Sequence, residues 1–346
     1  KNGNGADLTQ IYAVGKEISQ SINKFKIVIN KSTVPVTTGD ELEKIILKKV
    51  KKNHFSVVSN PEFLREGEAI RDFKYPDRIV IGSNNKKIFK KMELLYEPLI
   101  KKGAKFFCTS RKGAELIKYA SNAFLATKIT FINEIANLCE TAGINIEDIS
   151  VGMGSDARIG SRFLRAGPAY GGSCFPKDTK GLVSIADKFK SNLSIVKSVI
   201  KSNQNRKILL TKRVLKIMNN KIKNKKIAVL GVTFKANTDD MRESSSLVLI
   251  PYLLKKGAKV SYHDPSGPKN EFGKKKNLNF ASSINKACQG ADLIIINTEW
   301  DEFKSIDFKK IVKKSNFKIY DMRNLYNPIE LKKRNIKYYS VGRPKL

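Results

Sequence analysis

Residues 171–178, GGSCFPKD, place a cysteine three residues before a lysine and four before an aspartate. A nearby ammonium group stabilises a thiolate, the nucleophilic form of cysteine, and a carboxylate can act as a general base on water. Cys174, Lys177 and Asp178 therefore have the residue types of a nucleophilic site. The same pattern fits a buried structural cysteine beside a helix start, with Asp178 as the helix cap. From this segment alone both interpretations stay open.

A metal site is a third interpretation of Cys174, and the sequence supplies few ligands for one. The chain has two histidines and four cysteines, which are far apart and form no CxxC pair. A zinc site built from Cys and His needs several such ligands close together. We therefore expect no metal and no disulfide framework.

Polar side chains also follow two short apolar segments near the start of the chain. KST, with Ser32 and Thr33, comes after KIVIN, and NPEFLREG, with Glu62 and Glu66, comes after FSVVS. Ligands of parallel sheets bind at the carboxyl ends of the strands. Two carboxylates there suit proton transfer or the binding of sugar hydroxyls. The structural alternative is a turn threonine and acids that complement a helix dipole.

Residues 112–142 have the pattern of one long helix, which is apolar around most of its circumference and ends at Gly143, a natural C-cap. Lys118 and Asn122 are four residues apart in it and therefore share a face. A charged lysine is seldom placed on a face expected to be buried unless an anionic or oxyanionic group lies opposite. A helix that must be covered on several sides predicts a central helical domain and a subunit interface.

A second α/β segment begins near residue 221. Its first strand, KIAVLG, is almost wholly apolar and ends in glycine, and a helix and further strands follow. Lys235 and Arg242 come after this strand and just before a helix, which is a favourable place for phosphate. Loops carry charges in any case, so this pair alone does not decide the matter.

The composition narrows the classes of partner. The chain has 346 residues, with 66 Lys and Arg against 32 Asp and Glu, and its hydrophobic fraction of 41% is that of an ordinary folded protein. The excess charge is mostly lysine spread in short pieces, not an arginine-rich helix, so we expect no nucleic-acid partner. No apolar run is long enough to span a membrane and no secretion signal opens the chain, which predicts a cytoplasmic protein with no membrane partner.

The order of the elements predicts an α/β protein with two Rossmann-like doubly wound domains joined by a central long-helix domain. Helical patterns alternate with the apolar segments KIVIN, FSVVSN and DRIVIGS in the first hundred residues, which predicts a parallel sheet with KIVIN as a buried strand. Residues 155–178 are expected to be loop, and helices to resume at 179. The expected domains are residues 1–110, 111–220 and 221–346.

Taken together, these segments resemble the UDP-glucose/GDP-mannose dehydrogenase family. The resemblance rests on KSTVPVTTGD, SNPEFLREGEAIRDFKYPDRIVIG, ELIKYASNAFLATKITFINEIA, RIGSRFLRAGPAYGGSCFPKD and LGVTFKANTDDMRESSS, which occur in the family's order and approximate spacing. It implies a four-electron oxidation of the C6 alcohol of a nucleotide sugar to a carboxylate with two NAD in succession. KSTVPV, SCFPKD and PDRIVIG are closer to the UDP-glucose branch than to the GDP-mannose or N-acetylhexosamine branches.

The resemblance implies a chemical role for each matching residue. Cys174 matches the nucleophile that captures the intermediate aldehyde as a thiohemiacetal, and a second hydride transfer then gives a thioester that water hydrolyses. Asp178 matches the residue that works on water and protons, and Lys118 and Asn122 match the groups that stabilise the oxyanion. The polar residues around the reacting hydroxyl and the water match Thr33 and Glu62.

The family pattern also implies which residues hold the ligands. The positions beside NAD are Ser32, Thr33, Glu66, Lys177 and Arg242. The positions that hold UDP-glucose are Glu62, Phe63, Leu64, Lys118, Asn122, Arg158, Phe163, Leu164, Arg165, Tyr170, Gly171, Phe234, Lys235 and Arg323. Arg158 matches the arginine that reaches the site of a neighbouring subunit, which implies a homodimer or a higher homo-oligomer.

The chain departs from the family pattern at its start. The family opens with a strand and a GxGxxG turn that holds the NAD pyrophosphate, and no such turn occurs here. We therefore expect the first portion of the NAD-binding domain to be missing. Two alternatives to a UDP-glucose-oxidising enzyme follow, namely a nucleotide-sugar-binding fragment without turnover and a dehydrogenase for another nucleotide sugar.

Overall fold

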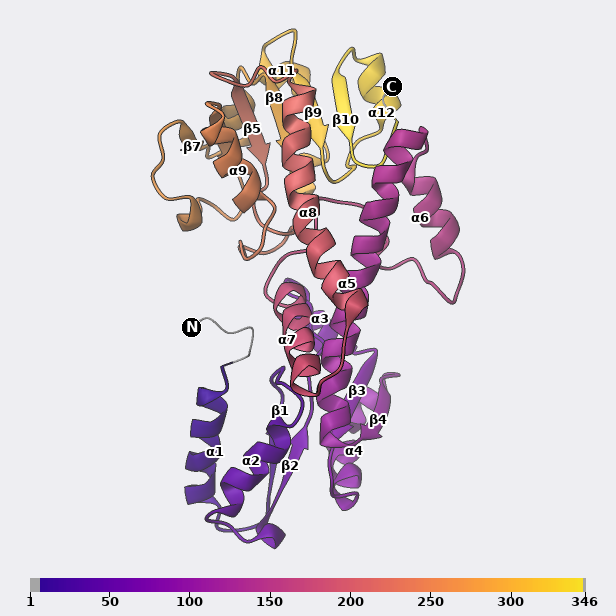
Figure 1. Ribbon diagram of the computed structural model, residues 1–346, viewed down its shortest axis with the longest axis vertical. Coiled ribbons are helices and arrows are strands. Elements are labelled where there is room, and N and C mark those ends of the chain that lie inside the picture. Colours follow the sequence, from indigo (N-terminus) through magenta and orange to yellow (C-terminus); the bar gives the residue numbers. More distant parts are fainter. Residues whose placement is uncertain (1–6, 345–346) are drawn as a thin grey trace. The chain divides into compact units, whose positions relative to one another are not determined.

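Figure 1 shows a computed structural model of the chain, in which residues 7–344 are described. The chain divides into two compact units. The first contains Lys1–Phe124 and Asp178–Leu193, and the second contains Leu125–Lys177 and Ser194–Leu346. No helix among the described residues is both long enough and apolar enough to cross a membrane.

The first unit holds a four-stranded sheet in the order β1-β2-β3-β4. β1 (Lys26–Asn30) is parallel to β2 (Phe55–Ser59), and β3 (Arg78–Gly82) is parallel to β4 (Lys105–Thr109). The expectation of a wholly parallel sheet is wrong at the centre, where β2 and β3 are antiparallel and share the single pair Ser59 and Gly82. The connection between them contains only the six-residue α3 (Ala69–Lys74), about 9 Å long, which is too short for a crossover beside a strand of about 16 Å.

β1 also differs from the expected buried strand. Lys26 is exposed and the other four residues are only partly buried, whereas β2 is buried throughout. Within the described residues β1 pairs with β2 alone and so lies at an edge of the sheet, where one neighbouring strand covers it instead of two.

Helices cover this sheet through two apolar clusters. α1 (Thr9–Ser21) and α2 (Thr38–Leu47) lie over β1 and β2, where Leu42 and Ile46 pack on Val57. α4 (Lys87–Ile100) covers β3 and β4, where Ile88 and Met92 contribute to the cluster. A short 3-10 turn, η1 (Lys52–His54), leads into β2.

The long helix is α5 (Arg111–Ala142), which matches the expected helix. Gly143 follows it with φ of 74°, the left-handed conformation of a glycine C-cap, as predicted. α7 (Phe175–Lys188) begins earlier than expected, so Lys177 and Asp178 lie in its first turn and not in the loop. Pro176 and Asp178 explain the early start, because proline is tolerated and an acid is favourable in the first turn of a helix.

The second unit contains a six-stranded parallel sheet in the order β10-β9-β8-β5-β6-β7. Its strands are β5 (Lys226–Leu230), β6 (Lys259–His263), β7 (Leu278–Phe280), β8 (Leu293–Ile296), β9 (Lys318–Asp321) and β10 (Lys337–Ser340). Its further helices are α6 (Ile146–Gly154), α8 (Ser194–Ile217), α9 (Ser246–Lys255), α10 (Ile284–Cys288), α11 (Phe308–Val312) and α12 (Pro328–Lys333), with 3-10 turns η2 (Asn270–Phe272) and η3 (Asp301–Phe303).

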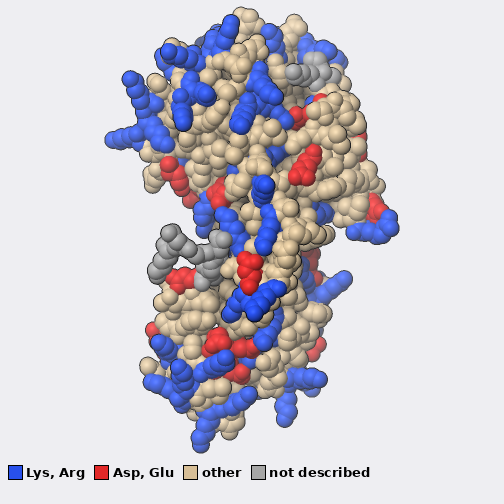
Figure 2. Space-filling view, in the orientation of Figure 1, with Lys and Arg blue, Asp and Glu red and all other residues tan. Residues whose placement is uncertain are grey.

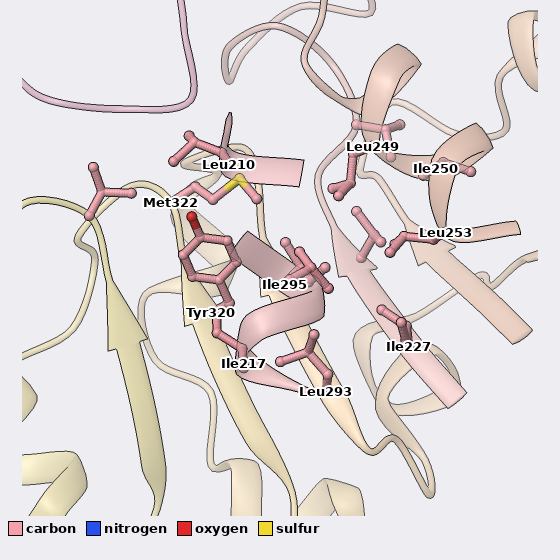
Figure 3. Packing of buried hydrophobic residues seen from close by; sticks show 14 of the residues in the cluster. Leu210, Ile217, Ile227, Leu249, Ile250, Leu253, Leu293, Ile295, Tyr320 and Met322 are labelled. Carbon is pink, nitrogen blue, oxygen red and sulfur yellow. The ribbon is translucent and has the colours of Figure 1, made fainter. Parts of the chain in front are cut away.

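Alternate residues of the central strands face two separate layers of helices. Ile227 and Ile295 pack against α8 and α9 on one face, which Figure 3 shows from close by. Ala228 and Ile294 pack against α10, α11 and α12 on the other face. This is the doubly wound arrangement, so the predicted class of Rossmann-like domains with a long-helix segment between them is confirmed.

Charge is dispersed over the visible face of the molecule. On the face shown in Figure 2, Lys and Arg side chains are scattered over each unit, with acidic side chains among them, and do not gather in one patch.

Candidate functional site

The first unit brings Glu62, Phe63 and Lys118 together. Glu62 follows β2, and its carboxylate accepts a hydrogen bond of 2.5 Å from the Leu64 N–H. Lys118, on α5, is 3% exposed, and its Nζ lies 3.9 Å from Glu62 Oε1 and 5.1 Å from the centre of the Phe63 ring. An ammonium group removed from water with no closer carboxylate in the described residues is placed to stabilise negative charge that develops on a ligand.

One turn further along α5, Asn122 meets Asp178. The Asn122 Nδ2 donates a hydrogen bond of 2.6 Å to Asp178 Oδ2, and both side chains are buried. α7 approaches α5 closely here, because a Cβ at Gly181 would lie 2.8 Å from the Tyr119 ring. Burial, with the charge of Asp178 as a second cause, raises the pKa of the Tyr119 hydroxyl far above its usual value. The predicted residues Glu62, Lys118, Asn122 and Asp178 thus form two pairs along α5, Lys118 with Glu62 and Asn122 with Asp178.

Ser32 and Thr33 follow β1, as expected. Ser32 is exposed and Thr33 is half-buried. Asn30, the last residue of β1, accepts a hydrogen bond from the Ser32 N–H, while its buried Nδ2 has no hydrogen-bond partner among the described residues. A buried amide donor without a partner at a strand end is suited to a polar ligand.

In the second unit, Cys174 is exposed and stands immediately before α7, with its Sγ 3.5 Å from Ser173 Oγ. Gly171 and Gly172, which precede it, allow the chain to approach the segment after β5 closely. A Cβ at Gly171 would lie 2.7 Å from the Glu243 carbonyl oxygen, and one at Gly172, where φ is 79°, would lie 2.6 Å from the Phe234 ring. The two glycines thus let this loop pack closely against the segment after β5.

Predicted nucleotide-sugar residues surround this loop. The rings of Phe163 and Tyr170 each pack edge-to-face on the Phe175 ring, with ring centres 6.1 Å apart. Arg323, just after β9, donates to the carbonyl oxygens of Phe234, at 2.7 Å, and Asn297, at 2.9 Å. Burial lowers the pKa of the Arg323 guanidinium, while the charge of Glu299 acts in the opposite direction.

Two more predicted residues lie close to these. Lys235 Nζ is 5.7 Å from the Phe234 ring centre, and Arg165 Nη2 donates to the Arg323 carbonyl oxygen at 3.3 Å. Phe234, Asn297 and Arg323 follow β5, β8 and β9, so this group lies at the carboxyl ends of three parallel strands.

Three further predicted residues remain. Arg242 joins the glycine loop before Cys174 through its backbone, since its carbonyl oxygen accepts a hydrogen bond of 2.7 Å from the Gly172 N–H. The Arg158 guanidinium is exposed and pairs with Asp156, and the Arg242 guanidinium pairs with Asp240. Leu164 is 3% exposed and packs in the core of the second unit, so its side chain contacts apolar residues.

Sequence reasoning missed Arg111 and Glu115, which continue the polar row on α5. Arg111 is 2% exposed and forms ion pairs with Asp40 at 2.7 Å and Glu43 at 2.6 Å. Glu115 is 3% exposed, and burial raises its pKa although its hydrogen bonds act in the opposite direction. The criterion that singled out Lys118, a charge on a face expected to be buried, applies equally to these two residues.

Three sequence models of one family match the chain. They are the NAD binding domain at residues 1–100, the central domain at 112–205 and the UDP binding domain at 228–328 of the UDP-glucose/GDP-mannose dehydrogenase family. A UDP-glucose 6-dehydrogenase of Rhizobium meliloti is 46% identical over 99% of this chain and 80% of its own length. The chain belongs to the UDP-glucose/GDP-mannose dehydrogenase family.

Two further relatives support this family assignment. A UDP-glucose 6-dehydrogenase of Bacillus subtilis is 40% identical over 98% of this chain and 73% of its own length. The solved UDP-glucose dehydrogenase of Pyrobaculum islandicum has a TM-score of 0.87 and 31% identity, covering 98% of this chain and 76% of that one. The expected absence of a first portion is not shown, and inactivity because of it is not supported.

The residues present fit the cofactor of this family. The strand end with Ser32, Thr33 and the buried Asn30 amide lies inside the segment that matches the NAD binding domain. Among the described residues, no three His, Cys, Asp or Glu side chains gather as metal ligands.

The burial of the four cysteines predicts their reactivity in the folded protein. Iodoacetamide should modify Cys174 and Cys108, which are exposed, and should spare Cys139 and Cys288. Burial keeps the reagent away from Cys139 and Cys288, and it also raises the pKa of Cys139, and that of Cys288 to about 12. Mass spectrometry of peptides after brief treatment at pH 7 checks this. Modification of Cys288 at the rate of Cys174 without denaturant would contradict the structure.

Proposed function

We propose that the chain catalyses the NAD-dependent four-electron oxidation of UDP-glucose to UDP-glucuronate, with Cys174 as the nucleophile. The observation that carries the proposal is the polar row on α5, in which the buried ammonium of Lys118 faces Glu62 and Asn122 is bonded to Asp178. The relatives named as UDP-glucose 6-dehydrogenases support the substrate and the reaction.

The proposed first oxidation removes a hydride from the sugar C6 and a proton from its hydroxyl. Lys118 and Asn122 donate hydrogen bonds to the oxygen as negative charge develops on it, which lowers the barrier. NAD, when bound, supplies the hydride acceptor for both oxidations. Its proposed contacts are Ser32, Thr33, Glu66, Lys177 and Arg242.

The thiol then holds the aldehyde. The Cys174 Sγ bonds to C6, and the oxyanion that forms takes a proton, which gives a thiohemiacetal. Loss of a second hydride and of the hydroxyl proton leaves a thioester. Water, positioned by Asp178, adds to the thioester carbon, the C–S bond breaks and the thiolate leaves. The sum converts an alcohol, two NAD and one water to a carboxylate, two NADH and three protons.

The group around Arg323 is proposed to hold the UDP portion. Arg165, Lys235 and Arg323 offer positive charge for a diphosphate, and Phe234 offers an apolar ring beside them. The segment that matches the UDP binding domain contains Phe234, Lys235 and Arg323.

The thiol role is tested by Cys174→Ala. We expect at least about a 1,000-fold loss of UDP-glucuronate formation, because no thioester can form, and a UDP-glucose Kd within about threefold of the parent. Chromatography of products and calorimetric titration measure the two quantities. Cys108→Ala, which removes the other exposed thiol, is the matched control and should keep full activity. Near-parental uronate formation by Cys174→Ala would refute the mechanism.

We further propose a functional homodimer. Phe131 and Leu138 are seven residues apart on α5 and are 47% and 61% exposed, and Val151 on α6 is 72% exposed. Apolar side chains that recur every seven residues on an exposed helix face suit packing against a second helix. The exposed Arg158 is then available to a neighbouring subunit.

The predicted cytoplasmic location is consistent with a reaction that consumes NAD and a nucleotide sugar.

The helix interface is tested with the double variant Phe131→Glu and Leu138→Glu. Since two buried carboxylates would face an apolar partner, we expect light scattering to report half the mass of the parent assembly. Ile329→Glu alters an equally exposed residue on α12 and should leave the mass unchanged. A parent that is already monomeric, or a double variant of unchanged mass, would contradict the proposed interface.

A further inference from the structure

We propose that Glu115 is a positioning residue whose buried carboxylate clamps the loop after β1, which carries Ser32 and Thr33, to the end of β2 and to α5. The inference rests on the proposed function, because the loop matters to turnover only if Ser32 and Thr33 lie beside NAD. All of the residues involved belong to the first unit.

The clamp consists of three hydrogen bonds to one carboxylate. Glu115 Oε1 accepts from the Gly39 N–H at 2.8 Å and from Ser59 Oγ at 2.9 Å, and Oε2 accepts from the Thr37 N–H at 2.8 Å. Thr37 and Gly39 come from the loop after β1 and the start of α2, and Ser59 is the last residue of β2. One side chain on α5 therefore joins the carboxyl ends of two neighbouring strands.

The loop needs this support because its backbone is strained. Thr37 is β-branched and has φ of 87°, in the left-handed region that such residues rarely adopt. Its N–H is held by Glu115, while its carbonyl oxygen accepts from the N–H groups of Asp40 and Glu41 at the start of α2. The bond to Glu115 thus helps to hold the residue at the turn into the helix.

Close packing allows only glycine at position 39, next to the Glu115 carboxylate. A Cβ at Gly39 would lie 2.8 Å from both Glu115 Oε1 and Ser59 Oγ. The absence of a side chain lets the loop backbone reach the carboxylate directly. Thr38 then ties the loop to itself, since its N–H and hydroxyl both donate to the Pro35 carbonyl oxygen.

The same helix carries the proposed oxyanion groups. Lys118 and Asn122 are three and seven residues after Glu115 on α5. Fixing the loop and the end of β2 to Glu115 therefore also fixes Thr33 and Glu62 to the helix that presents Lys118 and Asn122. A small displacement of such groups from productive geometry is costly to rate and binding.

The test substitutes Glu115→Gln, which keeps the size of the side chain. Its amide nitrogen must face one of three donors, so the loop should loosen. We expect KM for NAD to rise about tenfold, because the loop that carries Ser32 and Thr33 loosens. KM for UDP-glucose should change by less than about twofold, since the contacts proposed for its UDP portion, Arg165, Lys235 and Arg323, lie in the second unit. Hydrogen exchange of a peptide that covers residues 31–41 should become about tenfold faster.

Glu43→Gln is the matched control. Glu43 lies on α2, is largely buried and pairs with Arg111, so this variant makes the same chemical change at a second buried carboxylate and leaves the three bonds of Glu115 intact. It should keep both KM values and the exchange of residues 31–41 near those of the parent. If Glu115→Gln does not fold, Ser59→Ala, which removes one of the three donors, should shift KM for NAD in the same direction by about threefold.

Two results would overturn the clamp. One is unchanged exchange of residues 31–41 in Glu115→Gln. The other is a KM for NAD and a KM for UDP-glucose that rise by the same factor, and do so in Glu43→Gln as much as in Glu115→Gln. That result would show that Glu115 has a merely structural role. If the parent forms no NADH from UDP-glucose, the proposed function fails, and the exchange comparison, which needs no turnover, still decides the clamp.

Discussion

Four charged or polar side chains are buried in a row on α5, and the cost of burying each without a partner determines how the first unit is assembled. Arg111 is paired with Asp40 and Glu43 of α2, Glu115 with the loop after β1 and the end of β2, and Asn122 with Asp178 of α7. Each pairing attaches another element to the same helix. An apolar helix of equal length could pack on this sheet in several registers, whereas these contacts permit one.

Lys118 is the exception in this row. Its nearest carboxylate oxygen among the described residues is 3.9 Å away, longer than the other ion pairs on the helix. A buried ammonium without a close counter-charge is stabilised by a ligand that brings negative charge. The same physical rule that makes Arg111 and Glu115 structural therefore makes Lys118 a candidate for chemistry.

Much of this arrangement could be predicted from the sequence. The period of apolar residues and Gly143 predicted α5, and the conflict between charge and burial predicted Lys118 and Asn122. The same conflict marks Glu115, but its partners could not be predicted, because two of them are backbone N–H groups in a turn where Thr37 adopts a positive φ. The antiparallel contact of β2 and β3 was missed because strand direction depends on the path of the connection. The start of α7 at Phe175 was missed because Pro176 is compatible both with a loop and with the first turn of a helix.

The proposed reaction is a double oxidation at one carbon through a thioester on Cys174. Its most direct test is the amount of NADH formed for each UDP-glucose consumed when the sugar is limiting. Two NADH for each UDP-glucose, with UDP-glucuronate as the only sugar product, is the predicted result. One NADH for each UDP-glucose with release of the free aldehyde would contradict this reaction.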